Sequence, residues 1–154
     1  MERGILPVED SEPHRRLLVE AAEQAAARDA TLVAVRFLDA DEYGDRLDTL
    51  ESVGRVENVE YDSDAVLDGV ATDTKALVRE VYDDAGVDVE TEVLVAVADE
   101  DDRATKVVET AADRGCDHAF VVGAGRSPTG KALFGDTAQR VILEFDGFVT
   151  SLVD

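Results

Sequence analysis

Apolar residues follow two alternating patterns along the chain. Five short runs rich in β-branched residues predict strands, at 5–8, 31–38, 87–97, 118–122 and 148–153. Four longer segments repeat apolar residues at helical spacing and predict helices, at 12–28, 63–85, 102–114 and 136–144. The pattern weakens in the acidic stretch 39–62, where we expect a long, mobile crossover with at most one short helix.

Residues that start and stop helices stand at the ends of the helical segments. The expected N-caps are Ser11, Ser63 and either Asp101 or Asp102. Pro13 falls in a first turn, where its missing N–H costs nothing. Gly86 and Gly115 lie just past the second and third helices, the usual place for a terminating glycine.

The alternation of strands and helices predicts an α/β fold in one domain, residues 1–154. Crossovers of this kind give a doubly wound, five-stranded parallel sheet with helices on both faces. Such sheets bind ligands outside the carboxyl ends of their strands. The loops of interest are therefore 9–11, 38–40, 97–101 and 123–135.

The loop from Gly123 to Gly135 is rich in glycine, follows a strand and precedes a helix. Backbone N–H groups and a helix dipole bind phosphate in that context. Residues 125–131 match the first seven positions of a P-loop, but Ala132 replaces the Ser or Thr that would hold Mg²⁺. Only 22 residues follow Ala132, since 154 − 132 = 22, so hydrolysis of a nucleoside triphosphate by such a loop is the less favoured interpretation.

A second interpretation is a family resemblance. Gly125 and Gly135 are separated by nine residues, and a first strand ends in Pro-Val-Glu-Asp-Ser at 7–11. With the Gly-Cys-Asp-His run that starts at Gly115, these features resemble the universal stress protein family over nearly the whole chain. That family has a Gly-x-x-Gly-x9-Gly-(Ser/Thr) loop and a first strand that ends in Pro-Val-Asp.

The resemblance implies a strand order of 3-2-1-4-5, a homodimer formed through the last strand, 148–153, and a site for ATP, with Mg²⁺ bound only together with the nucleotide. The site residues that it implies are Pro7, Glu9, Asp10, Ser11, Phe37, Gly123, Gly125, Arg126, Gly135, Asp136 and Thr137.

The chain departs from the family pattern at three of the implied positions. The first loop glycine falls on Val122, with Gly123 one position late. The adenine-contacting Asp falls on Glu9 or is shifted to Asp10. The hydroxyl residue after the last glycine falls on Asp136, whose carboxylate would repel phosphate although it also suits a helix N-terminus. Arg126, Lys131 and the displaced hydroxyl of Thr137 oppose that repulsion.

The net charge limits the classes of partner that the protein can bind. The chain carries 36 Asp and Glu against 15 Lys and Arg, for a net charge of −21. Nucleic-acid binding needs clustered basic residues and is not expected. The acidic, lysine-poor composition favours a protein adapted to concentrated salt over an ordinary acidic protein.

Other features argue against secretion, membranes and metal sites. No apolar run approaches the roughly 18 residues of a membrane span. Asp10 and Glu12 interrupt any signal peptide, and the lone Cys116 fits a reducing cytoplasm. The acids at 99–102 are more typical of a solvated helix start than of a cation site, and Cys116 with His118 lacks a second ligand pair. His14 is assigned to the surface.

The sequence therefore predicts a cytoplasmic sensor or regulator whose output is binding rather than catalysis. Two alternatives stay open: a dimeric interaction module of the same fold that binds no nucleotide, and a nucleotide hydrolase that uses loop 125–131.

Overall fold

The computed structural model describes residues 1–57 and 63–153, with side chains described outside 54–64. Its central sheet has five parallel strands: β1 (Arg3–Pro7), β2 (Thr31–Leu38), β3 (Thr91–Val97), β4 (His118–Val122) and β7 (Phe148–Leu152). Their order is β3-β2-β1-β4-β7. This is the expected order 3-2-1-4-5, because β7 is the fifth strand of this sheet.

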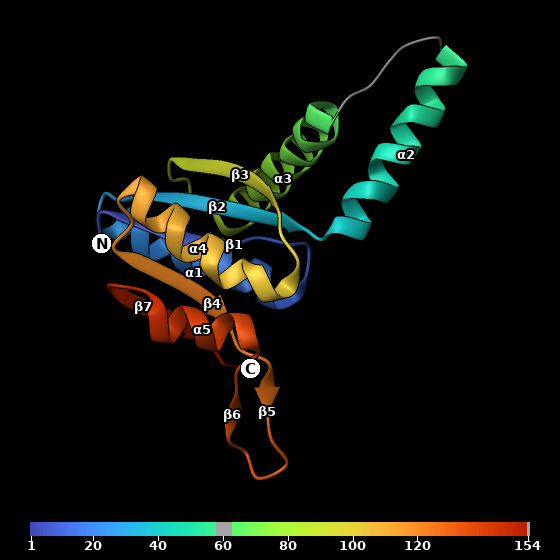
Figure 1. Ribbon diagram of the computed structural model, residues 1–154. Coiled ribbons are helices and arrows are strands. Elements are labelled where there is room, and N and C mark those ends of the chain that lie inside the picture. Colours follow the sequence, from blue (N-terminus) through green and yellow to red (C-terminus); the bar gives the residue numbers. More distant parts are fainter. Residues whose placement is uncertain (58–62, 154) are drawn as a thin grey trace.

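Helices cover both faces of the sheet (Figure 1). The described helices are α1 (Glu12–Ala27), α2 (Ala40–Glu57), α3 (Ser63–Ala85), α4 (Glu100–Arg114) and α5 (Asp136–Glu144). On one face α1 and α3 pack around Leu6, Leu18 and Tyr82. On the other, α4 and α5 pack around Ile5 and Val107. β1 and β2 are buried from both sides, which explains their continuous apolar runs.

Several helix ends lie where the sequence placed them. Ser11 caps α1 by accepting a hydrogen bond from the His14 N–H, and Pro13 lies in the first turn. α4 ends at Gly115, whose φ of 68° is the left-handed conformation that glycine adopts most easily. The start of α4 differs from the prediction, because Asp99 rather than Asp101 or Asp102 occupies the N-cap position. The expected capping by Ser63 lies outside the described side chains.

Two further predictions need correction. Residues 40–57 form the helix α2, which stands away from the sheet, instead of a crossover with at most a short helix (Figure 1). Strand β3 begins at Thr91 and not at Val87. Val87 instead donates its N–H to the carbonyl of Tyr82 at 3.1 Å, which keeps it in the turn after α3.

The glycine-rich loop contains an element that the sequence did not predict. Strands β5 (Gly125–Arg126) and β6 (Ala132–Leu133) pair in a short antiparallel hairpin that extends away from the sheet (Figure 1). Among the described residues, no helix is both long and apolar enough to cross a bilayer.

Candidate functional site

A cavity of about 260 Å³ lies at the carboxyl ends of β1, β2 and β4. The first turns of α1, α4 and α5 complete its walls. β1 leads to α1 on one face of the sheet, whereas β4 leads to α5 on the other. The cavity therefore lies where the winding of the sheet reverses, the place at which open α/β sheets bind ligands.

The cavity combines an apolar wall with charged groups. Four valines buried in the two cores form the apolar part: Val8, Val107, Val121 and Val141. The charged residues that line it are Glu9, Arg36, Glu100, Arg103 and Asp136. An apolar wall with a few polar groups suits a flat, partly polar small molecule.

His14 enters the cavity from the first turn of α1. Its Nδ1 lies 2.8 Å from Ser11 Oγ and 3.1 Å from Glu9 Oε1. Its side chain is only 18% exposed, which corrects the expectation of a surface residue. Burial lowers the pKa of His14, and the negative charge of Glu9 opposes that effect only in part. The ring is therefore neutral over a wider pH range than that of an exposed histidine.

Both arginines at the cavity already have partners. Arg103 donates from Nε to the carbonyl of Ala98 at 3.2 Å, and its guanidinium lies 5.6 Å from the centre of the Phe37 ring. Arg36 pairs with Glu42 at 3.1 Å and also donates to the carbonyl of Phe37. A bound anion would have to share Arg36 with Glu42, whereas among the described residues Arg103 is held only through Nε and its contact with the Phe37 ring.

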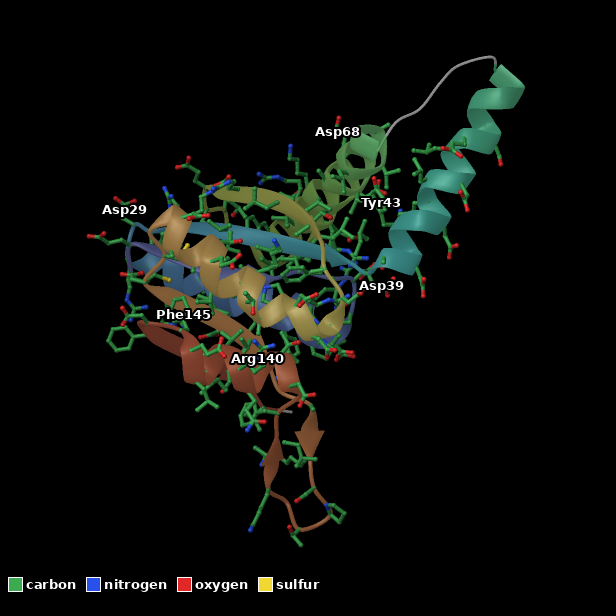
Figure 2. The ribbon with its side chains drawn as sticks, viewed as in Figure 1. Asp29, Asp39, Tyr43, Asp68, Arg140 and Phe145 are labelled. Atoms are coloured by element: carbon green, nitrogen blue, oxygen red, sulfur yellow. The ribbon has the colours of Figure 1, made fainter. Side chains whose placement is uncertain are left out.

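The two helices that supply the opposite wall are tied together. Arg140 of α5, which Figure 2 labels, donates to the carbonyl of Asp101 at 2.7 Å and to Thr105 Oγ1 at 3.2 Å. Thr137 Oγ1 donates to the carbonyl of Glu100 at 3.2 Å. These bonds fix the first turns of α4 and α5 relative to each other, and they engage the hydroxyl that was expected to meet phosphate.

Most of the predicted site residues line this cavity: Pro7, Glu9, Phe37, Gly123, Gly135, Asp136 and Thr137. Asp10, Ser11, Gly125 and Arg126 are not among the lining residues. Asp10 pairs with Arg15 at 2.7 Å on an exposed surface, and this hydrogen-bonded cation lowers the pKa of its carboxyl. Ser11 acts indirectly, because it caps α1 and holds the ring of His14.

The two glycines that line the cavity differ in how much space a side chain would have. A Cβ on Gly123 would lie 3.1 Å from the carbonyl oxygen of Leu133 and 3.2 Å from that of Leu152, so close backbone packing requires glycine there. A Cβ on Gly135 would meet nothing within 4 Å. Gly135 is also the N-cap of α5, with φ −65° and ψ 167°, so Asp136 is the first helical residue and does not cap the helix as expected.

The P-loop interpretation fails on geometry. Residues 125–131 lie in the β5–β6 hairpin, where Arg126 donates to the carbonyl of Gly130 at 3.0 Å. A phosphate-binding P-loop would lead straight into a helix after Lys131, whereas α5 begins only at Asp136. The hairpin also carries Arg126 and Lys131 away from the cavity, so neither cation lines it.

Sequence reasoning missed four ionisable lining residues: His14, Arg36, Glu100 and Arg103. Arg36 lies inside a predicted strand, and the other three lie in first helical turns. Side chains of a first turn at the carboxyl edge of the sheet are the signal that could have found His14, Glu100 and Arg103. Within the described part of the chain, no group of three or more His, Cys, Asp or Glu side chains is placed to hold a metal ion.

The sequence model of the universal stress protein family matches residues 1–149. The chain belongs to the universal stress protein family. This confirms the resemblance found in the loop and in the first strand. No curated protein matched the chain in a sequence search.

Solved universal stress proteins share the fold. One from Archaeoglobus fulgidus has 22% identity and a TM-score of 0.63, with 98% of each chain covered. A structure of the protein from Archaeoglobus fulgidus with dAMP has 17% identity, a TM-score of 0.60, and 98% and 97% covered. A universal stress protein in complex with cAMP has 17% identity, a TM-score of 0.59, and 99% and 96% covered. At these identities the likeness establishes the fold alone.

Proposed function

We propose that this universal stress protein domain binds an adenine nucleotide in the cavity between β1 and β4 and acts as a regulatory protein. The position of the cavity carries the proposal, because it joins an apolar wall to the first turns of three helices at the switch point. The complexes of two structurally similar proteins with dAMP and cAMP support an adenine nucleotide as the ligand class. We further propose that residues 1–154 act as one domain in the cytoplasm.

ATP is the ligand that the family resemblance implies, and Mg²⁺ would accompany its phosphates. The described charges favour a shorter phosphate chain. Glu9, Glu100 and Asp136 line the cavity with carboxylates. Arg36 there is already paired with Glu42, which leaves Arg103 as the lining arginine without a carboxylate partner among the described residues, and Lys131 lies outside the lining. We therefore expect AMP or cAMP to bind more tightly than ATP, and Mg²⁺ to reduce the difference by neutralising the triphosphate.

Mass spectrometry of the denatured, freshly purified protein tests whether a nucleotide accompanies it. Isothermal titration of the stripped protein with AMP, cAMP, ATP and adenosine then ranks the ligands. Saturable binding of at least one adenine nucleotide is the expected result. No binding by any of them would favour the interaction module that lacks a nucleotide.

A substitution at Gly135 tests the location. Gly135→Ser places a side chain in open space beside the cavity, and serine is a good N-cap, so folding should be unaffected. We expect nucleotide affinity to fall about tenfold or more. Gly44→Ser is the matched control, because Gly44 lies on α2, outside the cavity lining. A Cβ at Gly44 also meets nothing within 4 Å. Equal loss in both variants would contradict the location.

We also propose a homodimer formed through β7. In the described sheet β7 pairs only with β4, so its other edge is open. Phe148 on β7 and Leu143 on α5 are each 75% exposed, an unusual exposure for large apolar side chains. Pairing of β7 with its copy under twofold symmetry would cover both the open edge and these side chains.

A further inference from the structure

We propose that His14 is a specificity-determining residue of the cavity, which favours phosphate-bearing ligands by taking up a proton when they bind. This inference rests on the proposed function, because it concerns the ligand of the same cavity. It adds a residue and a pH response that the loop motif does not contain.

Contacts on one side of the imidazole leave the other side available. Glu9 Oε1 lies 3.1 Å from Nδ1, close enough to form an ion pair with a protonated ring. Ser11 Oγ lies 2.8 Å from the same nitrogen. No described residue hydrogen-bonds to Nε2. In the protonated ring both nitrogens are donors, so Nε2 can donate a hydrogen bond to a ligand anion while Nδ1 stays beside Ser11 and Glu9.

The other charged groups at the cavity determine how much a proton on His14 contributes to binding an anion. The other charged residues that line the same cavity are Glu100, Arg103, Arg36 and Asp136, and Glu9 contacts His14 from the loop before α1. Nearby on α1, Arg15 is occupied by Asp10 and Glu80. Arg36 is paired with Glu42, and Arg103 donates through Nε to a neutral carbonyl, so protonated His14 adds a further cation that a phosphate could recruit.

The sign of the pH effect follows from two shifts. Burial lowers the pKa of His14 in the free protein, so the ring is neutral at pH 7 to 8. A phosphate in the cavity would raise that pKa and cause proton uptake. Affinity should therefore increase as pH falls between the bound-state and free-state values, by about tenfold for each unit of difference. Below the free-state value His14 is already protonated, and the gain stops.

Titration calorimetry with AMP, cAMP and adenosine at several pH values from 5.5 to 8 tests this inference. His14→Gln keeps a hydrogen-bonding side chain but cannot take up the proton. His118→Gln is the matched control, since His118 is the other of the two histidines and lies at the opposite end of β4 from the cavity. The phosphodiester of cAMP does not titrate in this range, whereas the phosphate of AMP does, near pH 6.

We expect cAMP and AMP to bind the unmodified protein and the His118→Gln variant more tightly as pH falls. The His14→Gln variant should lose this dependence for cAMP, and adenosine should show none. Proton NMR adds a readout, because cAMP should raise the pKa of one of the two histidines, His14, and leave that of His118 unchanged. An unchanged pH dependence in His14→Gln, or the same dependence for adenosine, would overturn the role of His14 and leave the proposed function intact. Absence of adenine-nucleotide binding at every pH would overturn both.

Discussion

Asp136 places a carboxylate at the first position of α5, beside the backbone N–H groups that a bound phosphate would meet. A like charge at about 4 Å costs about 1 kcal/mol in water and more at a lower effective dielectric. The same carboxylate favours the helix, because negative charge in a first turn interacts well with the helix dipole. Asp136 should thus stabilise α5 while lowering the affinity for a phosphate bound as proposed.

The substitution Asp136→Ser should separate these two effects. We expect ATP affinity to increase about fivefold or more at low ionic strength, as the repulsion is removed. The free energy of unfolding should fall by about 0.5 kcal/mol, since the favourable interaction with the dipole is lost. Calorimetric titration and chemical denaturation measure the two quantities.

Asp68→Ser is the control for this substitution, because it makes the same change in net charge on an exposed face of α3 (Figure 2). It should leave ATP affinity nearly unchanged. If both variants bind ATP more tightly by the same factor, overall charge and not the position of Asp136 is responsible.

The sequence motif predicted the lining positions at strand ends and loop glycines. It missed most of the ionisable side chains that line the cavity. Pro7, Gly123 and Gly135 follow from strand ends and the loop spacing, and they do line the cavity. Arg126 was predicted from the same loop, but the hairpin turns it back onto Gly130. His14 was missed because the sequence at a helix start predicts the capping residue. It does not predict which side chain of the first turn faces the cavity.

At the scale of elements, α2 shows how local signals can form a helix that long-range packing barely supports. None of its described side chains is buried. Instead, Asp39 accepts a hydrogen bond from the Glu42 N–H at 2.7 Å, and Glu42 pairs with Arg36 and Arg46 (Figure 2 labels Asp39). Asp-x-x-Glu is a capping-box pattern. That pattern was present in the sequence, and the weak apolar periodicity concealed it.

β7 has a definite polarity toward its open edge. Phe148 donates its N–H to the carbonyl of Asp117, and the Leu152 carbonyl accepts from Gly123, so residues 148 and 152 face β4. Because backbone groups alternate along a strand, Thr150 also faces β4, while Val149 and Ser151 face outward. Any partner strand would therefore bond to residues 149 and 151.

Ser151→Pro should abolish the proposed dimer without breaking the sheet. Proline removes the outward donor at 151 and is tolerated where an edge N–H faces solvent. Light scattering should report a monomer for this variant and a dimer for the unmodified protein. Thr150→Pro is the contrasting variant, since it removes a donor to β4 and the Thr150 hydroxyl that lies 2.7 Å from His118 Nε2, and it should lower the melting temperature. An unmodified protein that is monomeric at micromolar concentration in high salt would rule out the dimer.

At the scale of the whole molecule, the alternation of strands and helices was enough to predict the sheet. Its order, β3-β2-β1-β4-β7, was implied by the family resemblance and not by the alternation. What the alternation could not predict was the β5–β6 hairpin, whose strands have only two residues each. Elements that short leave no periodicity to detect.

Net charge is the other property of the whole molecule, and ion pairs within the chain cannot remove it. Even if every Lys and Arg were paired with one acid, 36 − 15 = 21 carboxylates would be left without a basic partner. Ion pairs such as Arg79–Asp88 and Arg114–Glu92 lie on exposed surfaces, where a pair contributes little. Repulsion among the surplus carboxylates is therefore a sizeable cost of the compact state at low salt.

Molar KCl should consequently stabilise this protein. The Debye length falls from about 10 Å at 0.1 M to about 3 Å at 1 M, so screening becomes stronger. This removes most of the repulsion between surface carboxylates and also weakens the exposed ion pairs. Each kcal/mol of relief should raise the melting temperature by about 2–4 °C for a chain of this length. Thermal melts at 0.1, 0.5, 1 and 2 M KCl measure the effect, with sucrose as an uncharged control that stabilises by exclusion and not by screening. A melting temperature that is constant or falls with KCl would show that the acidic surface is not an adaptation to salt.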